Sequence, residues 1–164
     1  MPLAISPVAL GVIVRGNKIL TQSRIVQHKG YDPFYDRTYE CVGESLNQPK
    51  ELLLDALMRG IEEETGATAD GCTIFGANFT LTYNVTTSTR RDDQYCSVEP
   101  LLVTQTVMGP QPWVGFGFMV MVPGNWKSNY GAADGEAGSP KWWSPEHILE
   151  SIQQETKKWM GLPV

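Results

Sequence analysis

Residues 51–67, with the sequence ELLLDALMRGIEEETGA, predict the helix around which the rest of the chain is organised. Apolar and small residues recur there at helical spacing, so one face of the helix should lie on a hydrophobic core. The residues on that face are Leu53, Ala56, Leu57, Gly60 and Ile61. A sheet or a second helix must cover this face, which makes the segment the centre of one layer of the fold.

The ends of the predicted helix carry residues that favour helix termini. Asn47 or Gln48 would lie near the N-cap, and Pro49 suits the first turn, where its missing N–H costs little. Gly66 can end the helix in a left-handed conformation.

Three adjacent glutamates, Glu62, Glu63 and Glu64, lie in the last turns of this helix. The C-terminal end of a helix favours cations over carboxylates, so the run needs another cause. Glu63 and Glu64 follow Gly60 at i+3 and i+4, which places these positions on one face. Carboxylates there offer hard oxygen ligands to Mg²⁺ or Mn²⁺, and a run of solvated surface acids is the alternative.

This spacing resembles the signature of the Nudix hydrolases, G-x5-E-x7-R-E-U-x-E-E-x-G-U, in which U is aliphatic. The matching residues are Glu51, Arg59, Ile61, Glu63, Glu64 and Gly66. One departure is Gly60, which stands where a glutamate should follow Arg59. The other is the longer loop, because seven residues rather than five separate Gly43 from Glu51.

The resemblance implies a pyrophosphohydrolase that acts on a nucleoside diphosphate linked to another group. Its cofactor would be Mg²⁺ or Mn²⁺, bound by Glu63 and Glu64 so that the metal bridges phosphate oxygens and activates a water. The resemblance also implies that Arg59 is one of the catalytic residues and that Glu51 supports the metal ligands. Because Glu51 and Arg59 are eight positions apart, we do not expect them to pair directly along the helix.

Three residues outside the helix complete the predicted site. Gly43 and Glu44 lie in the segment that leads into the helix, and we expect them to support the site from there. Glu136 stands six positions before Trp142 in a Gly- and Ala-rich loop. In many Nudix proteins a late loop glutamate precedes a tryptophan in this way, so Glu136 is the candidate for a further metal ligand or the catalytic base. A solvated loop acid is the alternative reading of Glu136.

Gly60 separates two classes of function. The acid that is missing there contributes to the metal site in this family, although neighbouring acids such as Glu44 or Glu136 could substitute. The chain is therefore either a Nudix-type hydrolase or a catalytically weak or inactive Nudix-like module that binds a nucleotide or a protein. Because glycine leaves room on that ridge of the helix, we expect a Gly60→Glu variant to restore the third acid and raise metal affinity.

The remaining segments predict an α/β fold, a Nudix-like α/β/α sandwich with a mixed β-sheet in one domain, 1–164. Strands are expected at 8–14 and 19–23, which form a hairpin, and in the short segment 39–43. Longer strands are expected within 73–87, 94–108 and 113–122, where β-branched and aromatic residues are frequent. A final helix should span 144–160, with Ser144 as its cap and Pro145 at its first position.

Composition limits the partners. A net charge of −5 argues against a broad nucleic-acid-binding surface, whereas a small nucleotide held through metal is compatible with it. The three cysteines form no C-x-x-C pair, and we find no signal peptide, so we expect a cytoplasmic protein. No apolar run approaches the length that spans a bilayer, so no membrane partner is expected. A homodimer stays open as the state of assembly.

Overall fold

The computed structural model describes residues 5–23, 39–47, 51–68, 70–75, 81–83, 94–96, 98–106, 112–128 and 140–159. The strands are β1 (Ser6–Arg15), β2 (Lys18–Ser23), β3 (Tyr39–Glu40), β4 (Val42–Ser45), β5 (Thr73–Phe75), β6 (Leu81–Tyr83), β7 (Gln94–Cys96), β8 (Leu102–Thr106), β9 (Trp113–Met121) and β10 (Lys141–Trp143). The helices are α1 (Leu53–Thr65) and α2 (Pro145–Trp159).

The main sheet is mixed, as the sequence predicts. Its central path runs β10-β2-β1-β9-β5, with β3 beside β2, β4 beside β1 and β8 beside β9. Strands β1 and β9 are parallel along nine residue pairs. The predicted β1–β2 hairpin is confirmed as an antiparallel pair, with Val14 opposite Ile19. The α/β class with a mixed sheet is therefore confirmed.

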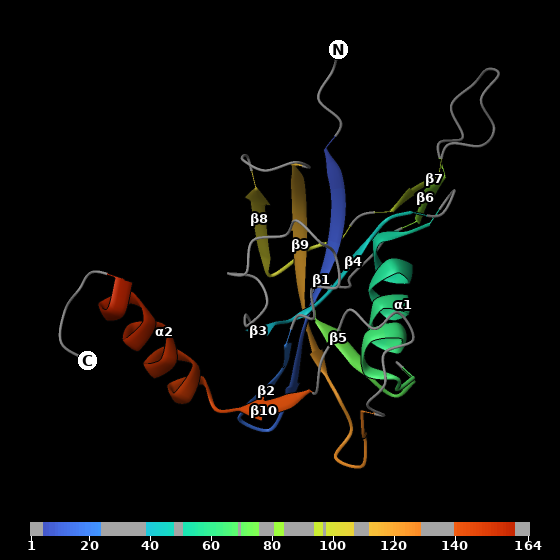
Figure 1. Ribbon diagram of the computed structural model, residues 1–164. Helices are drawn as coiled ribbons and strands as arrows, with labels where there is room; N and C mark the ends of the chain where they lie inside the picture. Colours follow the sequence, from blue (N-terminus) through green and yellow to red (C-terminus); the bar gives the residue numbers. More distant parts are fainter. Residues whose placement is uncertain are drawn as a thin grey trace.

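Helix α1 lies on one face of this sheet, where it packs on β1 and β4 (Figure 1). Its buried residues are Ala56, Leu57, Gly60, Ile61 and Thr65, which confirms the predicted inward face except at Leu53, which is only partly buried. The strands contribute apolar side chains to the same core, all at most 3% exposed: Ile13, Val42, Phe118 and Val120. Each large apolar side chain buried here contributes about 1.5–3 kcal/mol. This packing fixes the position of the acidic end of α1 relative to β4.

The two ends of α1 were predicted unequally well. Gly66 caps the C-terminus in the left-handed conformation, with φ 64°, and its N–H donates to Glu62 O at 2.9 Å. The N-terminus lies later than predicted: the Asn47 N–H donates to the Glu51 carboxylate at 3.1 Å, and α1 begins only at Leu53. The Asp55 carboxylate accepts a hydrogen bond from the Leu52 N–H at 3.3 Å, and this N–H has no carbonyl partner within the helix. The predicted cap near Asn47 or Gln48 is wrong, because the N-cap of α1 is Leu52; Gln48 and Pro49 themselves lie outside the described residues.

Two strands that the sequence predicts as single are divided. Within 73–87, β5 pairs with β9 in the main sheet, whereas β6 pairs with β7 in a separate two-stranded sheet. Within 94–108, β7 belongs to that small sheet and β8 to the main one. β-Branched residues fit either pleated surface, so propensity does not reveal where a chain changes its partner.

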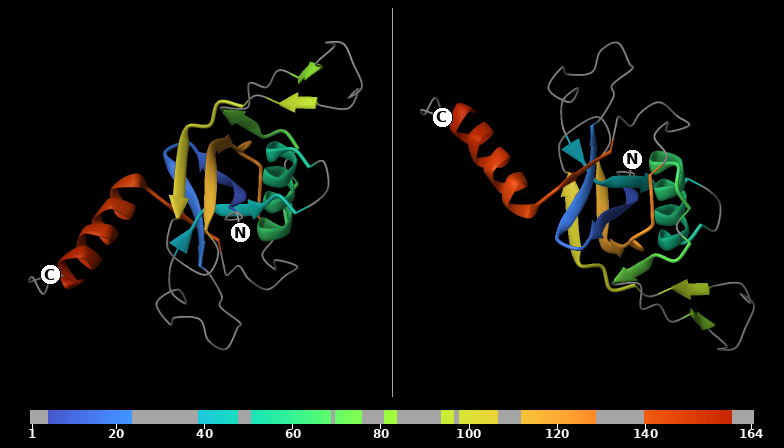
Figure 2. Two further views of the ribbon diagram at one scale, coloured as in Figure 1. Left: turned by 90° about the horizontal axis from the view of Figure 1, so that it is seen from above. Right: turned by 90° about the horizontal axis from the view of Figure 1, so that it is seen from below.

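The final helix is confirmed and takes an outlying position. The His147 N–H donates to Ser144 Oγ at 3.3 Å, and Pro145 is the first helical residue. Helix α2 continues from β10 and extends away from the sheet in every view (Figures 1 and 2). Leu149 and Ile152 consequently stay 59% and 57% exposed. Within the residues that the structure describes, neither helix has the length and apolar character to cross a membrane.

Candidate functional site

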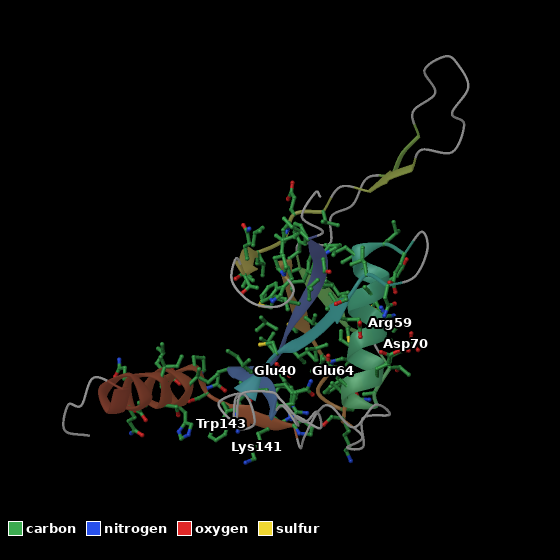
Figure 3. The ribbon with its side chains drawn as sticks, turned by 45° about the horizontal axis from the view of Figure 1, so that its top comes forward. Glu40, Arg59, Glu64, Asp70, Lys141 and Trp143 are labelled. Carbon is green, nitrogen blue, oxygen red and sulfur yellow. The ribbon has the colours of Figure 1, made fainter. Side chains whose placement is uncertain are left out.

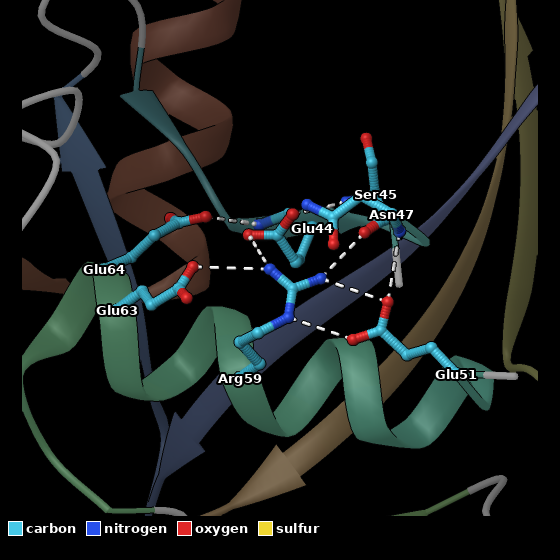
Figure 4. Close-up of polar contacts among 8 residues, drawn as sticks. Glu44, Ser45, Asn47, Glu51, Arg59, Glu63 and Glu64 are labelled. Atoms are coloured by element: carbon cyan, nitrogen blue, oxygen red, sulfur yellow. Dashed lines mark hydrogen bonds and ion pairs between the residues drawn. The ribbon is translucent and has the colours of Figure 1, made fainter. Parts of the chain in front are cut away.

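Arg59 lies at the centre of a network of carboxylates between β4 and α1 (Figure 4). Its Nε is 2.9 Å from Glu51 Oε1, and its Nη1 is 3.2 Å from Glu44 Oε2 and 3.4 Å from Glu63 Oε2. Its Nη2 donates to the backbone oxygen of Ser45 at 2.9 Å. One planar guanidinium therefore ties the helix to the strand that crosses it.

The prediction that Glu51 and Arg59 do not pair is wrong. Arg59 Nε and Nη2 both donate to Glu51, at 2.9 and 3.3 Å, in a bidentate ion pair. Glu51 precedes the first residue of α1, so helical geometry does not set the direction of its side chain. The side chain reaches along the helix to Arg59. At 5% exposure the Glu51 side chain is nearly buried. Glu51 therefore contacts Arg59 directly, and its predicted role in supporting the metal ligands stays a prediction.

Glu64 is held by hydrogen bonds from two strands, β4 and β2. The Gly43 N–H donates to Glu64 Oε1 at 3.2 Å, and Gln22 Nε2 on β2 donates to Glu64 Oε2. Gln22 is only 2% exposed, and its Oε1 atom has no hydrogen-bond partner. Gly43 therefore contacts Glu64 directly, and its predicted supporting role stays a prediction.

Gln22 is the residue of this site that sequence analysis missed. It stands two positions after Leu20, which is 3% exposed, and side chains two apart along a strand share one face. That alternation was the available signal. A polar side chain predicted on the buried face of a strand needs a partner, and here the partner is Glu64.

The place beside Gly60 is already filled by β4. A Cβ on Gly60 would stand 2.7 Å from Glu44 Cβ and 3.4 Å from Val42 Cγ1. Val42 and Glu44 alternate on the strand, so both point toward α1. Glycine is what allows the strand to cross the helix this closely. A glutamate cannot be added at position 60 without displacing β4, which overturns the expectation that Gly60→Glu simply restores an acid.

Burial and neighbouring charges shift several groups here. Burial raises the pKa of the Glu44 carboxyl, although the Arg59 guanidinium and the Ser45 N–H oppose that change. The hydrogen bond to Glu51 is the main cause that raises the pKa of Arg59. Burial, followed by the charges of Glu40 and Glu64, raises the pKa of the Cys41 thiol. This shift favours the protonated thiol, which is the less nucleophilic form of cysteine.

Figure 3 shows how the described polar residues are distributed over the fold. Arg59 and Glu64 lie on α1 and Glu40 on strand β3, whereas Lys141 and Trp143 lie on β10, which precedes helix α2. Trp143 stacks on the His147 ring with centroids 4.4 Å apart, which joins β10 to α2.

Comparison with solved structures places this arrangement among known folds. A hydrolase of the NUDIX family from Clostridium perfringens superposes with a TM-score of 0.58, at 15% identity over 90% of this chain and 87% of that one. A NUDIX hydrolase from Nitrosomonas europaea gives a TM-score of 0.53, at 15% identity over 90% and 77%. The MutT protein from Methanosarcina mazei gives 0.55, at 16% identity over 92% and 84%. The chain has the Nudix fold.

Comparison of the amino-acid sequence alone does not find this relationship. No family model matches the chain, and no curated protein matches it significantly. The resemblance read from the helix and the likeness of the structures nevertheless agree on one fold, although they use different information.

The site of this Nudix fold gathers the donors that a hard divalent cation uses. Glu44 lies beside the place that a Cβ at Gly60 would fill, Glu63 and Glu64 lie in the last turns of α1, and the buried Gln22 Oε1 has no hydrogen-bond partner. Within the described part of the chain, no group of three His, Cys, Asp or Glu side chains is arranged so that it could hold a metal ion. Carboxylate and amide oxygens are the ligand type that Mg²⁺ and Mn²⁺ accept, and Arg59 pairs with the carboxylates of Glu44 and Glu63. Glu136 lies outside the described residues, so its predicted role stays a prediction.

Proposed function

We propose that the protein is a metal-dependent hydrolase that cleaves the diphosphate bond of a nucleoside diphosphate linked to another group. The observation that supports this most is the position of Glu64, fixed between Gly43 and Gln22 at the acidic end of α1 in a Nudix fold. A small nucleotide is the substrate class, because a net charge of −5 disfavours a long polyanion.

Each residue of the site has a distinct role in this proposal. Glu63 and Glu64 would hold Mg²⁺ or Mn²⁺, which supplies charge neutralisation for the phosphates and a more acidic water. Gly43 and Gln22 orient the Glu64 carboxylate, so little reorganisation is needed when charge develops. Arg59 anchors the Glu63 side of the cluster, and a carboxylate accepts the proton of the attacking water.

Removing either helix carboxylate should impair the reaction. Glu63→Gln and Glu64→Gln are each expected to lower turnover by about tenfold or more, because each removes a charge that acts on the metal. Both should keep the fold, since Glu63 is exposed and Gln is isosteric with Glu. The measurement is initial rate at saturating substrate and limiting Mn²⁺, with circular dichroism as the folding control. Full turnover in either variant would remove that residue from the metal site.

Glu136 carries a separate prediction. If it accepts a proton from the attacking water, Glu136→Gln should lower kcat more than it raises KM, because that contact matters mainly in the transition state. The pH–rate profile should also lose its acidic limb. An unchanged profile would leave Glu136 as a loop acid without a part in the chemistry.

One screen tests the proposed function as a whole. The full chain is assayed with Mg²⁺ and with Mn²⁺ against nucleoside triphosphates, ADP-ribose, dinucleoside polyphosphates and nucleotide sugars. Metal-dependent release of a mononucleotide supports the enzyme. Binding without hydrolysis supports the alternative of a nucleotide-binding module, which the lack of a ready three-acid cluster among the described residues favours.

A further inference from the structure

The main sheet has a second apolar face, on the side away from α1. Gly11 faces α1, because a Cβ there would lie 2.9 Å from Leu57 Cδ1. Leu10 and Val12 stand on either side of Gly11 in β1, so they point to the opposite face. The strand register extends this face across β8, β9 and β5 in three rows: Leu10 with Gly117 and Leu102, Val12 with Met119 and Phe75, and Val14 with Met121. We call these residues the open sheet face.

The open sheet face is apolar and accessible to solvent. Leu102 and Met121 are each 44% exposed, and Phe75 is 38% exposed. None of the side chains in its three rows is charged. An apolar surface that runs over several strands is typical of an interaction site, and a sheet in a layered fold normally has such a face covered by another element.

Helix α2 carries the complementary surface. Ile148, Leu149 and Ile152 follow the spacing i, i+1 and i+4, which places them on one stripe of the helix. Leu149 and Ile152 are more than half exposed, as noted above. A helix stripe of this kind is stabilised when it packs on an apolar sheet. The chain therefore contains both halves of a helix-on-sheet contact.

The joint between β10 and α2 directs the helix away from the sheet of its own chain. Only Ser144 separates Trp143, the last residue of β10, from Pro145, the first of α2. Ser144 Oγ accepts the His147 N–H, and the Trp143 ring stacks on the His147 ring. These contacts hold the direction of the helix at its first turn, and Figures 1 and 2 show that it extends outward. In this direction the stripe meets another molecule rather than its own sheet.

The size of the contact favours a second copy of this chain over an unrelated partner. Helix α2 has 15 residues, so it is about 22 Å long and about 10 Å wide. One such helix covers on the order of 200 Å² of a sheet, too little to hold two different proteins together. A two-fold arrangement makes the contact twice and buries on the order of 900 Å² over all four surfaces, which is the size of a weak, reversible complex.

We propose that α2 of one chain packs on the open sheet face of a second copy, and that the second copy makes the same contact in return. The product is a symmetric homodimer formed by exchange of helices. The interface uses the face of the sheet opposite α1, so it leaves the carboxylates of α1 accessible. The inference does not depend on the proposed function.

Sedimentation equilibrium of the full chain tests the proposal. From about 1 to about 200 µM, the wild type should change from monomer to dimer, with a Kd on the order of 10 µM. Leu149→Glu should raise this Kd by about tenfold or more, because it would bury a carboxylate in an apolar contact. A wild type that stays monomeric over the whole range overturns the proposal, and this includes the case in which α2 covers its own sheet.

Two further variants decide which surfaces are in contact. Gln154→Glu is the matched control, because position 154 is exposed and lies two residues after Ile152, on the other side of the helix. Its Kd should stay within about twofold of the wild type. Met121→Glu alters the open sheet face and should weaken the dimer as strongly as Leu149→Glu does. Circular dichroism verifies that each variant is folded, as expected for changes at exposed positions.

The pattern of effects identifies any other mode of assembly. A dimer that Leu149→Glu weakens and Met121→Glu does not would pair helix with helix, and it would contradict the exchange. A dimer that neither variant weakens would use another surface, and it would contradict the exchange as well. Weakening in both variants, with none in Gln154→Glu, is the result that supports it.

Discussion

Replacing Arg59 with alanine is expected to lower the free energy of unfolding by about 3 kcal/mol, the cost of breaking a largely buried ion pair. Three carboxylates would lose their shared cation, and Glu51 would stay nearly buried at 5% side-chain exposure. The strand β4 would also lose its tie to α1 through the Ser45 carbonyl. Urea unfolding of the variant and the wild type at neutral pH measures the change. The two curves should have the same m-value, the dependence of the unfolding free energy on urea concentration.

Two further variants give this prediction its controls. Arg59→Lys keeps the charge but not the planar fork, so its loss of stability should be intermediate. Arg59→Ala combined with Glu51→Ala should be less destabilised than the sum of the single changes, because no buried charge is left alone. A loss below about 1 kcal/mol in Arg59→Ala would mean that the network behaves as an ordinary surface cluster.

Gly60→Glu should destabilise the chain by about 3 kcal/mol, at the upper end of the cost of overpacking. The new Cβ would lie 2.7 Å from Glu44 Cβ, and Glu44 is paired with Ala9 in the sheet, so the strand cannot move freely. The added carboxylate would also face the charges of Glu44 and Glu63. Thermal and urea unfolding in the absence of added metal measure the change.

A reversal of sign makes the explanation for Gly60 testable. Alanine normally stabilises a helix interior by about 1 kcal/mol relative to glycine. Gly60→Ala should nevertheless be destabilising in the wild type, because its Cβ meets the same contact. In a Glu44→Gly background that contact is gone, so Gly60→Ala should become stabilising. If Gly60→Ala stabilises the wild-type chain, the close approach of β4 is not what selects glycine.

Much of the site could be read from residues 51–67 because the helix repeats regularly. The spacing of Gly60, Glu63 and Glu64 on one ridge, and the end of the helix at Gly66, follow from helical geometry alone. The pairing of Glu51 with Arg59 could not be read in the same way, because it depends on a side chain that lies before the helix begins.

The sequence by itself determined the inward face of α1, the β1–β2 hairpin, β9 and the capped helix α2, since local periodicity and capping carry that information. Only the tertiary structure decided that β4 crosses α1 at Gly60, that Gln22 meets Glu64, and that β5 and β6 lie in different sheets. Those contacts join residues distant along the chain, and no local pattern reports which distant surfaces will pack together. The physical reason is that periodicity fixes the direction of a side chain, whereas packing fixes what the side chain meets.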